Sequence, residues 1–220
     1  MITQLEIRLD DIMKSNEFSI ESVSDLSSIQ EDFNALNVPQ DYTARDYQDI
    51  FFLNDEQILR KHNTGFMCQT VQKRGVPIKM AYSGRSFRNL EPTNERDCIS
   101  YQYEGVIIDK NINLSDGMHF LLQVLESLVG SSSITAVYKF FPYAEPGLML
   151  QIDETDRYHE QSAVGTKRNI CPCGMIHPSI LEGLNIDTEQ YRGFSFCINL
   201  SQIAKYMLNL HDIRELFADE

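Results

Sequence analysis

A confined basic segment contains the residue types that best suit an anionic ligand. Residues 57–90 carry seven basic residues and no acidic one, whereas the whole chain has 19 basic and 32 acidic residues. Arginine and lysine hold phosphate and carboxylate groups. The segment is therefore a candidate site for a small phosphorylated or carboxylate ligand, and a solvated basic face is the alternative. Its basic residues are Arg60, Lys61, Lys73, Arg74, Lys79, Arg85 and Arg88.

Two pairs of residues have the spacing that puts side chains on one face of a strand. Gln102 and Glu104 are two positions apart, and so are Phe141 and Tyr143. In a strand, residues at this spacing point to the same side of the sheet. Amide and carboxylate oxygens can accept hydrogen bonds from a cationic group, and aromatic rings can pack against an apolar one. A polar sheet edge and ordinary core packing are the respective alternatives.

A metal site is a third chemistry that the sequence raises, around Cys171, Cys173 and His177. Zinc sites usually space paired cysteines by about two to four residues and need a fourth ligand, which is not evident here. We therefore predict no metal site. A reactive thiol at Cys171 or Cys197 is a weaker expectation than buried packing.

Hydrophobic periodicity and turn residues indicate the elements that must position these groups. Helices are predicted over residues 3–15, 115–129, 178–184 and 201–208, with further helical stretches in 55–74 broken near Gly65. Strands are predicted over residues 77–82, 99–108, 134–141, 148–152 and 195–200. Ser115 is the expected N-cap of its helix, and Glu145–Gly147 is an expected turn. A long loop over 84–97, carrying Arg85 and Arg88, would join an antiparallel pair in an α+β fold.

Composition and charge limit the class of protein. The chain is 42% hydrophobic and 23% charged, with a formal net charge of −13, so an ordinary globular domain is expected and broad nucleic-acid binding is not. Its length suits one domain over residues 1–220. No apolar run reaches the roughly 18–20 residues of a membrane-spanning helix, and no signal peptide is recognisable. Five cysteines without a disulfide framework favour a cytoplasmic protein with reduced thiols.

Four stretches, taken in order, carry a family resemblance over about residues 5–217. They are Phe33-Asn-Ala-Leu-Asn-Val-Pro39, Gly84-Arg-Ser-Phe-Arg88 with Gln102-Tyr-Glu-Gly105, Phe141-Pro-Tyr-Ala-Glu-Pro146, and Cys173-Gly-Met-Ile-His-Pro178 with Gly193-Phe-Ser-Phe196. Their order and spacing resemble the catalytic core of the phenylalanyl-tRNA synthetase alpha subunit, a class II synthetase. The resemblance implies an antiparallel sheet of six or seven strands flanked by helices. It also implies attack of an amino-acid carboxylate on the α-phosphate of ATP, which gives an aminoacyl adenylate.

The resemblance assigns roles to individual residues. Arg88 matches the catalytic arginine that binds the α-phosphate, where a fixed cation would stabilise developing charge. Gln102 and Glu104 match residues that bind the amino group. His62 and Thr64 match a His-x-Ser segment near the same amino acid, and threonine keeps the hydroxyl.

The side-chain pocket is assigned in the same way. Phe141 and Tyr143 match a pair of phenylalanine rings, and Ser195 takes the place of a small residue, usually alanine, at the pocket floor. Serine would narrow the slot and offer a hydrogen bond. We therefore expect an aromatic amino acid of phenylalanine size or smaller, polar aromatic ones included.

The chain departs from the family pattern mainly where the nucleotide would bind. Gln202 stands where the family has the arginine that clamps the γ-phosphate of ATP, and Asn169 stands where it has an acidic residue for Mg²⁺. Losing one charge-assisted contact costs about 1.5–3 kcal/mol, so both ATP and Mg²⁺ are expected to bind weakly. Cys197 and Asn199 replace two glycines of the third motif. Val23-Ser24 replaces the Gly-Pro of the family's dimer contact, although a homodimer stays open.

Three functions follow from these matches and departures. The first is a stand-alone enzyme that activates an aromatic amino acid with ATP and passes it to a carrier-protein thiol or a small amine. The second is an amino-acid-binding or regulatory paralog that has lost ATP-dependent catalysis. The third is a subunit of a larger synthetase. The tRNA-binding arms of the family are not recognisable and the chain is acidic, so whole tRNA is an unexpected partner.

Overall fold

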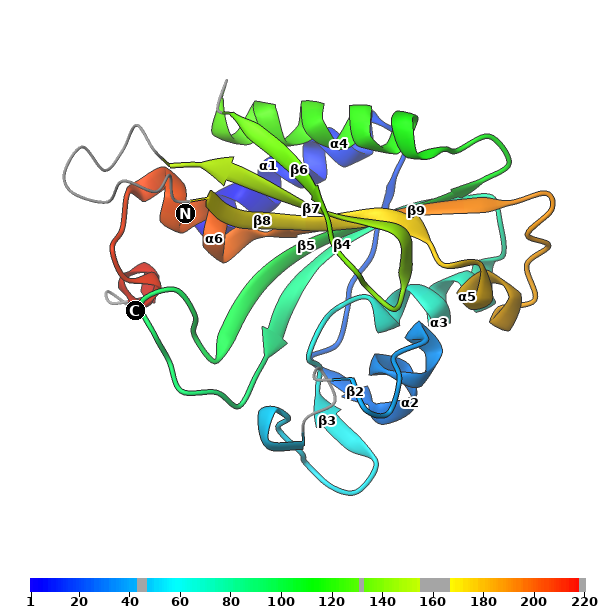
Figure 1. The fold of residues 1–220 in the computed structure, drawn as a ribbon, viewed down its shortest axis with the longest axis horizontal. Helices are drawn as coiled ribbons and strands as arrows, with labels where there is room; N and C mark the ends of the chain where they lie inside the picture. The colour runs from blue at the N-terminus through cyan, green and yellow to red at the C-terminus, as the bar shows by residue number, and fades with distance from the viewer. Residues whose placement is uncertain (43–46, 131–132, 155–166, 218–220) are drawn as a thin grey trace.

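A twisted sheet of seven strands organises the described part of the chain (Figure 1). The structure is a computed structural model that describes residues 1–42, 47–130, 133–154 and 167–217. β1 pairs in parallel with β4, and every other neighbouring pair is antiparallel. This arrangement confirms the expected α+β class with a largely antiparallel sheet. In spatial order the strands are β1 (Ser19–Ile20), β4 (Ile78–Phe87), β5 (Ile99–Asp109), β9 (Arg192–Asn199), β8 (Lys167–Ile176), β7 (Ala144–Asp153) and β6 (Ile134–Tyr138).

Three helices cover one face of the sheet and build the larger hydrophobic core (Figure 1). In the first helix Leu5, Leu9 and Met13 recur every four residues, so all three lie on one buried stripe. They pack in one cluster with Phe194 and Phe196 of β9. The helices are α1 (Ile2–Ser15), α4 (Leu114–Val129) and α6 (Leu200–Leu208). None of the described helices is long and apolar enough to cross a membrane.

Shorter elements cover the opposite face and form a second core against β4 and β5. Met67 and Val71 pack there with Tyr82 and Val106. Gly65 allows α2 and α3 to approach, because a Cβ atom at this position would lie 2.5 Å from the Glu31 carbonyl oxygen. The elements are α2 (Ile29–Asp32), η1 (Asn34–Leu36), η3 (Tyr47–Asp49), α3 (Gly65–Arg74), α5 (Pro178–Gly183) and the small antiparallel pair β2 (Leu26–Ser28) and β3 (Gln57–Leu59); a last turn, η4 (Ile213–Phe217), follows α6.

The connection between β4 and β5 is shorter than the sequence indicates. Strand β4 continues to Phe87, because Ser83–Phe87 keep pairing with Ile99–Tyr103. Arg85 therefore lies on the strand, and the loop that joins the antiparallel pair is residues 88–98. We call this segment the arginine loop, since Arg88 begins it.

Other element predictions need correction. Asn113, and not Ser115, caps α4, where its side-chain oxygen accepts a hydrogen bond from the Asp116 backbone. Glu145–Gly147 lie within β7, and the turn before this strand spans residues 139–143. Strand β8 was not predicted, because Pro172 and Gly174 are poor strand formers and interrupt its pattern.

Candidate active site

Strand register puts three of the predicted site residues on one face of the sheet. Side chains that face each other across an antiparallel ladder point to the same side. Gln102 pairs with Asn199, Glu104 with Cys197, and Val106 with Ser195. Since Val106 belongs to the core beneath α3 and α5, this is the face that those helices cover.

Glu104 is the centre of a buried polar cluster. It accepts a hydrogen bond from the Asn63 backbone at 3.1 Å and one from the Tyr82 hydroxyl at 3.4 Å. The side chains of Thr64 and Cys197 also hydrogen-bond to it. Burial raises the pKa of Glu104 to about 7, and these hydrogen bonds oppose the rise only in part. The carboxyl group therefore changes protonation near neutral pH.

Several polar atoms around Glu104 are buried without a hydrogen-bond partner among the described residues. They are Nδ1 of His62, Oδ1 of Asn63 and Oε1 of Gln102. Burial lowers the pKa of His62, so this ring is neutral, and it meets the Phe33 ring edge-on with centroids 5.9 Å apart. Unpartnered buried polar atoms are uncommon in folded proteins and indicate a place for a ligand or water. Acceptors next to an ionisable carboxyl group suit an ammonium donor.

A cleft of about 620 Å³ reaches this cluster at Gln102 and is also lined by the predicted nucleotide residues. Arg88, Gln102, Asn169 and Gln202 all line it, from the arginine loop, β5, β8 and α6. Five basic and three acidic side chains line the cleft, in a chain whose net charge is −13. The Arg88 side chain is exposed and forms no ion pair with a residue that the structure describes. An anionic ligand could therefore reach it directly.

The opposite end of the cleft contains a network of charged side chains. Arg168 of β8 binds Glu154 through Nε at 2.7 Å and Nη2 at 3.2 Å, and binds Glu95 through Nη1 at 2.9 Å. Lys205 of α6 binds the other oxygen of Glu95 at 2.5 Å. Gln202 accepts a hydrogen bond from Arg168 and donates one to the Glu95 carbonyl at 2.8 Å. We call these five residues the charged network; it attaches the arginine loop to β8 and α6.

The aromatic pair lies apart from the cleft. The rings of Phe141 and Tyr143 stack with centroids 5.3 Å apart and planes at 20°. Tyr143 is packed near Glu104 and Cys197, and burial raises its pKa above the usual value. Phe141 instead lines a second cavity, of about 490 Å³. The structure thus brings Tyr143, but not Phe141, to the Glu104 cluster.

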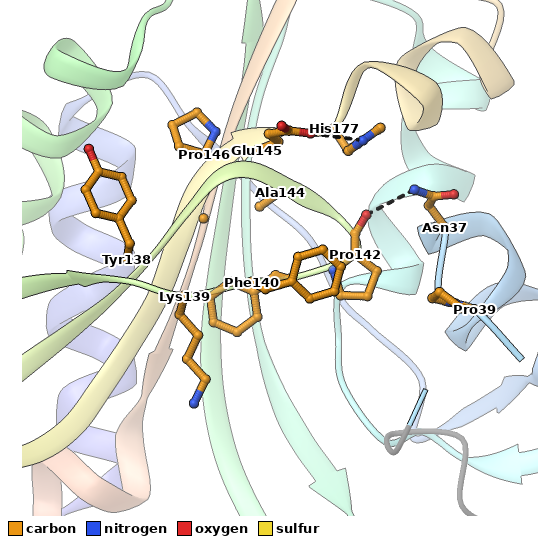
Figure 2. A pocket seen from close by; sticks show the side chains of 12 residues that line it. Asn37, Pro39, Tyr138, Lys139, Phe140, Pro142, Ala144, Glu145, Pro146 and His177 are labelled. Atoms are coloured by element: carbon orange, nitrogen blue, oxygen red, sulfur yellow. Dashed lines mark hydrogen bonds and ion pairs between the residues drawn. The ribbon is translucent and has the colours of Figure 1, made fainter. Parts of the chain in front are cut away.

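Figure 2 shows this second cavity and the side chains around it. Asn37 donates a hydrogen bond to the Pro142 carbonyl at 3.2 Å, and His177 lies 3.3 Å from a Glu145 carboxylate oxygen. The first contact attaches the turn before β7 to the end of η1, and the second attaches β7 itself to the start of α5. Lys139 lines this cavity as well as the larger cleft. Among the described residues, no group of three or more His, Cys, Asp or Glu side chains is arranged to hold a metal ion.

Sequence reasoning missed most of the partners of the predicted site residues. Tyr82 and Asn63 contact Glu104, although neither stands out in the sequence. Lys205 left a weak signal, since it is a charged residue between Ala204 and Tyr206 in its helix, whereas Arg168 stands between Lys167 and Asn169 and left none. A buried charge needs a partner, so such positions indicate an ion-pair network.

Comparisons with known proteins agree with this fold. The family model described as tRNA synthetases class II core domain (F) matches residues 1–220. The phenylalanine–tRNA ligase alpha subunit of Christiangramia forsetii is 30% identical over 226 residues, which cover 100% of this chain and 66% of that protein. The protein of the same name from Persephonella marina is 32% identical over 219 residues, covering 97% and 63%. The chain thus spans slightly less than two thirds of the length of these relatives.

A solved structure shows the same fold at low sequence identity. Pyrrolysyl-tRNA synthetase from Desulfitobacterium hafniense superposes with a TM-score of 0.74 at 9% identity, over 100% of this chain and 74% of that one. The family match extends over the whole chain, and both the sheet and the sequence relatives agree with it. The chain therefore belongs to the class II tRNA synthetase core family, and its curated relatives are alpha subunits of phenylalanine–tRNA ligases.

Proposed function

We propose that this chain activates an aromatic amino acid with ATP to form an aminoacyl adenylate. The observation that carries the proposal is the single cleft that Gln102 and Arg88 share with four further basic side chains. An amino acid held at Gln102 would have its carboxylate in the same cleft as a cation for the α-phosphate. The names of the relatives, phenylalanine–tRNA ligase alpha subunits, support an aromatic substrate.

The amino group would bind at the Glu104 cluster. An ammonium carries three N–H donors, and Glu104, Gln102 and the neutral His62 ring supply acceptors for it. Thr64 would hold the Glu104 carboxylate through its hydroxyl group. The ammonium would stabilise the ionised form of Glu104, which burial disfavours in the free protein.

The aromatic side chain would lie toward Tyr143 and Ser195. Tyr143 is packed close to Glu104, and Ser195 is two residues before Cys197 on the same face of β9. Phe141 would support the Tyr143 ring by stacking on it. Serine at the floor favours a ring of phenylalanine size or one with a polar substituent.

In the activation step, the carboxylate of the amino acid attacks the α-phosphorus of ATP and pyrophosphate leaves. Arg88 would stabilise the charge that develops on the α-phosphate oxygens, because its side chain is exposed and lies in the cleft. Close placement of the two reactants would supply a further part of the acceleration.

Magnesium fits this donor set poorly. Mg²⁺ prefers carboxylate oxygens, whereas position 169 is an asparagine whose side-chain oxygen already accepts a hydrogen bond from Gln151 at 2.8 Å. Glu154, an acidic residue of the same cleft, is bound to Arg168 through both oxygens. The proposed mechanism therefore depends on Arg88 and the other side chains of the cleft for charge neutralisation.

The acceptor is the finer part of the proposal. We place a carrier-protein thiol or a small amine first, because a net charge of −13 opposes the phosphates of whole tRNA. A role as one subunit of a larger synthetase, with tRNA bound in part by another chain, is the alternative that the names of the relatives support. Co-purification with a larger partner would favour this alternative.

An amino-acid-binding protein without catalysis is the second candidate. The charged network favours it, because Gln202 is neutral and Arg168 is already bound to two carboxylates of the chain itself. This candidate predicts that the affinity for amino acids is indifferent to ATP.

Amino-acid-dependent exchange of labelled pyrophosphate into ATP tests the first proposal. We expect exchange with phenylalanine, tyrosine or a related aromatic amino acid. Calorimetry with the same amino acids, with and without ATP, provides the matched measurement. Binding of the amino acid without any exchange, across all twenty amino acids and aromatic analogues, would instead support the binding protein.

A further inference from the structure

We propose that Arg168 and Lys205 form the site for the terminal phosphates of the nucleotide, and that the Glu95 carboxylate occupies this site until the nucleotide displaces it. The inference deepens the proposed function and rests on it. It assigns a phosphate-binding role to Arg168, which lines the cleft near the uncharged Gln202, and to Lys205, which is buried behind Glu95.

The two cations hold one carboxylate in the way that they would hold a phosphate group. Oε1 of Glu95 lies 2.5 Å from Nζ of Lys205, and Oε2 lies 2.9 Å from Nη1 of Arg168. The cations come from two different elements, α6 and β8, and converge on one anionic group. Their side chains are only 1% and 6% exposed, so both are fixed in place by the surrounding protein. Such preorganised cations are what a phosphoryl group requires.

The two carboxylates of the network differ in how easily they can leave. Glu154 is 7% exposed and holds Arg168 through both of its oxygens. Glu95 belongs to the arginine loop, and its side chain is 52% exposed. Rotation of Glu95 toward solvent therefore requires little rearrangement, whereas removal of Glu154 would disturb the core.

Charge balance predicts what must replace Glu95. With Glu95 in place, two cations face two carboxylates. Without it, Arg168 keeps Glu154, but Lys205 keeps only the Asn94 carbonyl at 2.7 Å, and a buried uncompensated charge is strongly unfavourable. Hydrogen bonds lower the pKa of Glu95 despite its partial burial, so it is an anion at neutral pH and competes as one. A phosphate group that enters the cleft can take its place.

Gln202 fits this exchange. Its side chain accepts a hydrogen bond from Arg168 and donates one to the Glu95 carbonyl at 2.8 Å. It thus orients the guanidinium of Arg168 toward the cleft and attaches the loop that carries Glu95. In this reading the cation at this end of the cleft comes from β8 rather than from position 202.

Calorimetric titration of the full chain tests the exchange, with ATP, inorganic pyrophosphate and AMP as ligands. Glu95→Gln removes the competing charge, so Arg168 and Lys205 become free to bind a phosphate group. The affinity for ATP and for pyrophosphate should therefore rise roughly tenfold. AMP has no terminal phosphates and should bind as it does to the unaltered chain. Glu91→Gln removes a charge from an exposed position of the same loop and is the matched control, with no change expected.

A double variant identifies the cations responsible for the gain. In Glu95→Gln with Lys205→Met, both partners of the ion pair are removed, so no buried charge is left unpaired. This variant should lose most of the tenfold gain. If this variant does not fold, Glu95→Gln with Arg168→Lys is the substitute. It keeps a positive charge at position 168 but removes the forked guanidinium group, so it should lose part of the gain in ATP affinity. Thermal unfolding of each variant provides the folding control.

The outcomes separate this inference from the proposed function. Equal affinity for ATP in the unaltered chain, in Glu95→Gln and in the double variant, with exchange intact, would overturn the inference alone. A gain in Glu95→Gln that persists in the double variant would also overturn it. No binding of ATP by any variant, together with no exchange, would overturn both.

Discussion

The two ends of the cleft differ in how far their polar groups are satisfied. At the end proposed for the amino acid, His62, Asn63 and Gln102 each bury a polar atom that lacks a hydrogen-bond partner among the described residues. At the end proposed for the terminal phosphates, Arg168 makes hydrogen bonds to Glu154, Glu95 and Gln202. One end has acceptors without donors, and the other has cations that already hold anions.

This difference shows what the structure must do to bind each ligand. An unpartnered buried acceptor costs about 1–3 kcal/mol, and a ligand that supplies the donor recovers this free energy. A cation that is already paired gives no such gain, since the ligand must first displace the internal carboxylate. We therefore expect the amino acid to bind in a cleft that is largely preformed, and the nucleotide to bind with an exchange of partners.

Arg88 should have the largest effect, because it is the exposed cation between the two ends. Arg88→Ala removes the charge expected at the α-phosphate, so the rate of pyrophosphate exchange should fall roughly 10²–10³-fold. The affinity for the amino acid, measured without ATP by calorimetry, should stay within about twofold. This split between rate and binding would place Arg88 at the reacting phosphate.

Arg85→Ala is the matched control for Arg88. Arg85 lies three residues earlier on β4, where it pairs with Asp25 and does not line the cleft. A surface ion pair contributes only about 0–1 kcal/mol, so exchange should be nearly unchanged. Equal losses in the two variants would mean that general loss of positive charge, and not the position of Arg88, is responsible.

Gln202→Arg tests whether the proposed phosphate site lacks a cation at position 202 or obtains its cation from Arg168 instead. If the neutral residue is the defect, the substitution should tighten ATP binding. The structure predicts otherwise, because the new guanidinium would face Arg168 and remove the acceptor that Gln202 gives to it. We expect no gain in ATP affinity by calorimetry and a loss of unfolding free energy of about 1–3 kcal/mol.

Gln202→Leu separates the two causes of this loss. It removes both side-chain hydrogen bonds of Gln202 but adds no charge. Chemical denaturation should show a smaller destabilisation for leucine than for arginine. Tighter ATP binding in Gln202→Arg would contradict the rearranged network and would identify position 202 as the residue that weakens the site.

The pH dependence of amino-acid binding tests the other end of the cleft. Burial raises the pKa of Glu104 to about 7, so most of the carboxyl groups are protonated at pH 6 and most are ionised at pH 8. Only the ionised form can pair with an ammonium. Affinity should therefore rise about tenfold from pH 6 to pH 8, with release of a proton on binding at the lower pH. Calorimetry in buffers of different ionisation enthalpy measures both quantities.

Glu104→Gln is the control for this pH dependence. Glutamine keeps the size of the side chain but does not ionise, so the affinity should become weak and nearly independent of pH. His62 would not mimic this effect, because burial lowers the pKa of its ring and so favours the neutral form. A tenfold change that persists in the variant would assign the titration to another group.

The arrangement of Gln102 and Glu104 was more predictable from the sequence than the charged network, for a physical reason. The spacing of Gln102 and Glu104 depends only on the period of a strand, and β5 forms with that period. The ion pair between Arg168 and Glu95 joins residues 73 positions apart, and no local pattern encodes it. Strand β8 itself was missed because Pro172 and Gly174 obscure its periodicity. Local periodicity can be read from one sequence, whereas the long-range pairing of charges depends on the assembled sheet.

Ser195 should have the smallest effect, because it tunes the pocket and takes no part in charge stabilisation. Its side chain shares a face of the sheet with Glu104, through the pairing of β5 and β9. Ser195→Ala removes a hydroxyl group that can hydrogen-bond to a polar ring substituent, a contact worth about 0.5–1.5 kcal/mol. The preference for tyrosine over phenylalanine, measured as a ratio of exchange rates, should therefore fall about two- to tenfold. Ser15→Ala changes an exposed serine at the end of α1 that does not line the cleft, and this ratio should stay constant. A fall of equal size in both variants would show that Ser195 does not form the floor of the pocket.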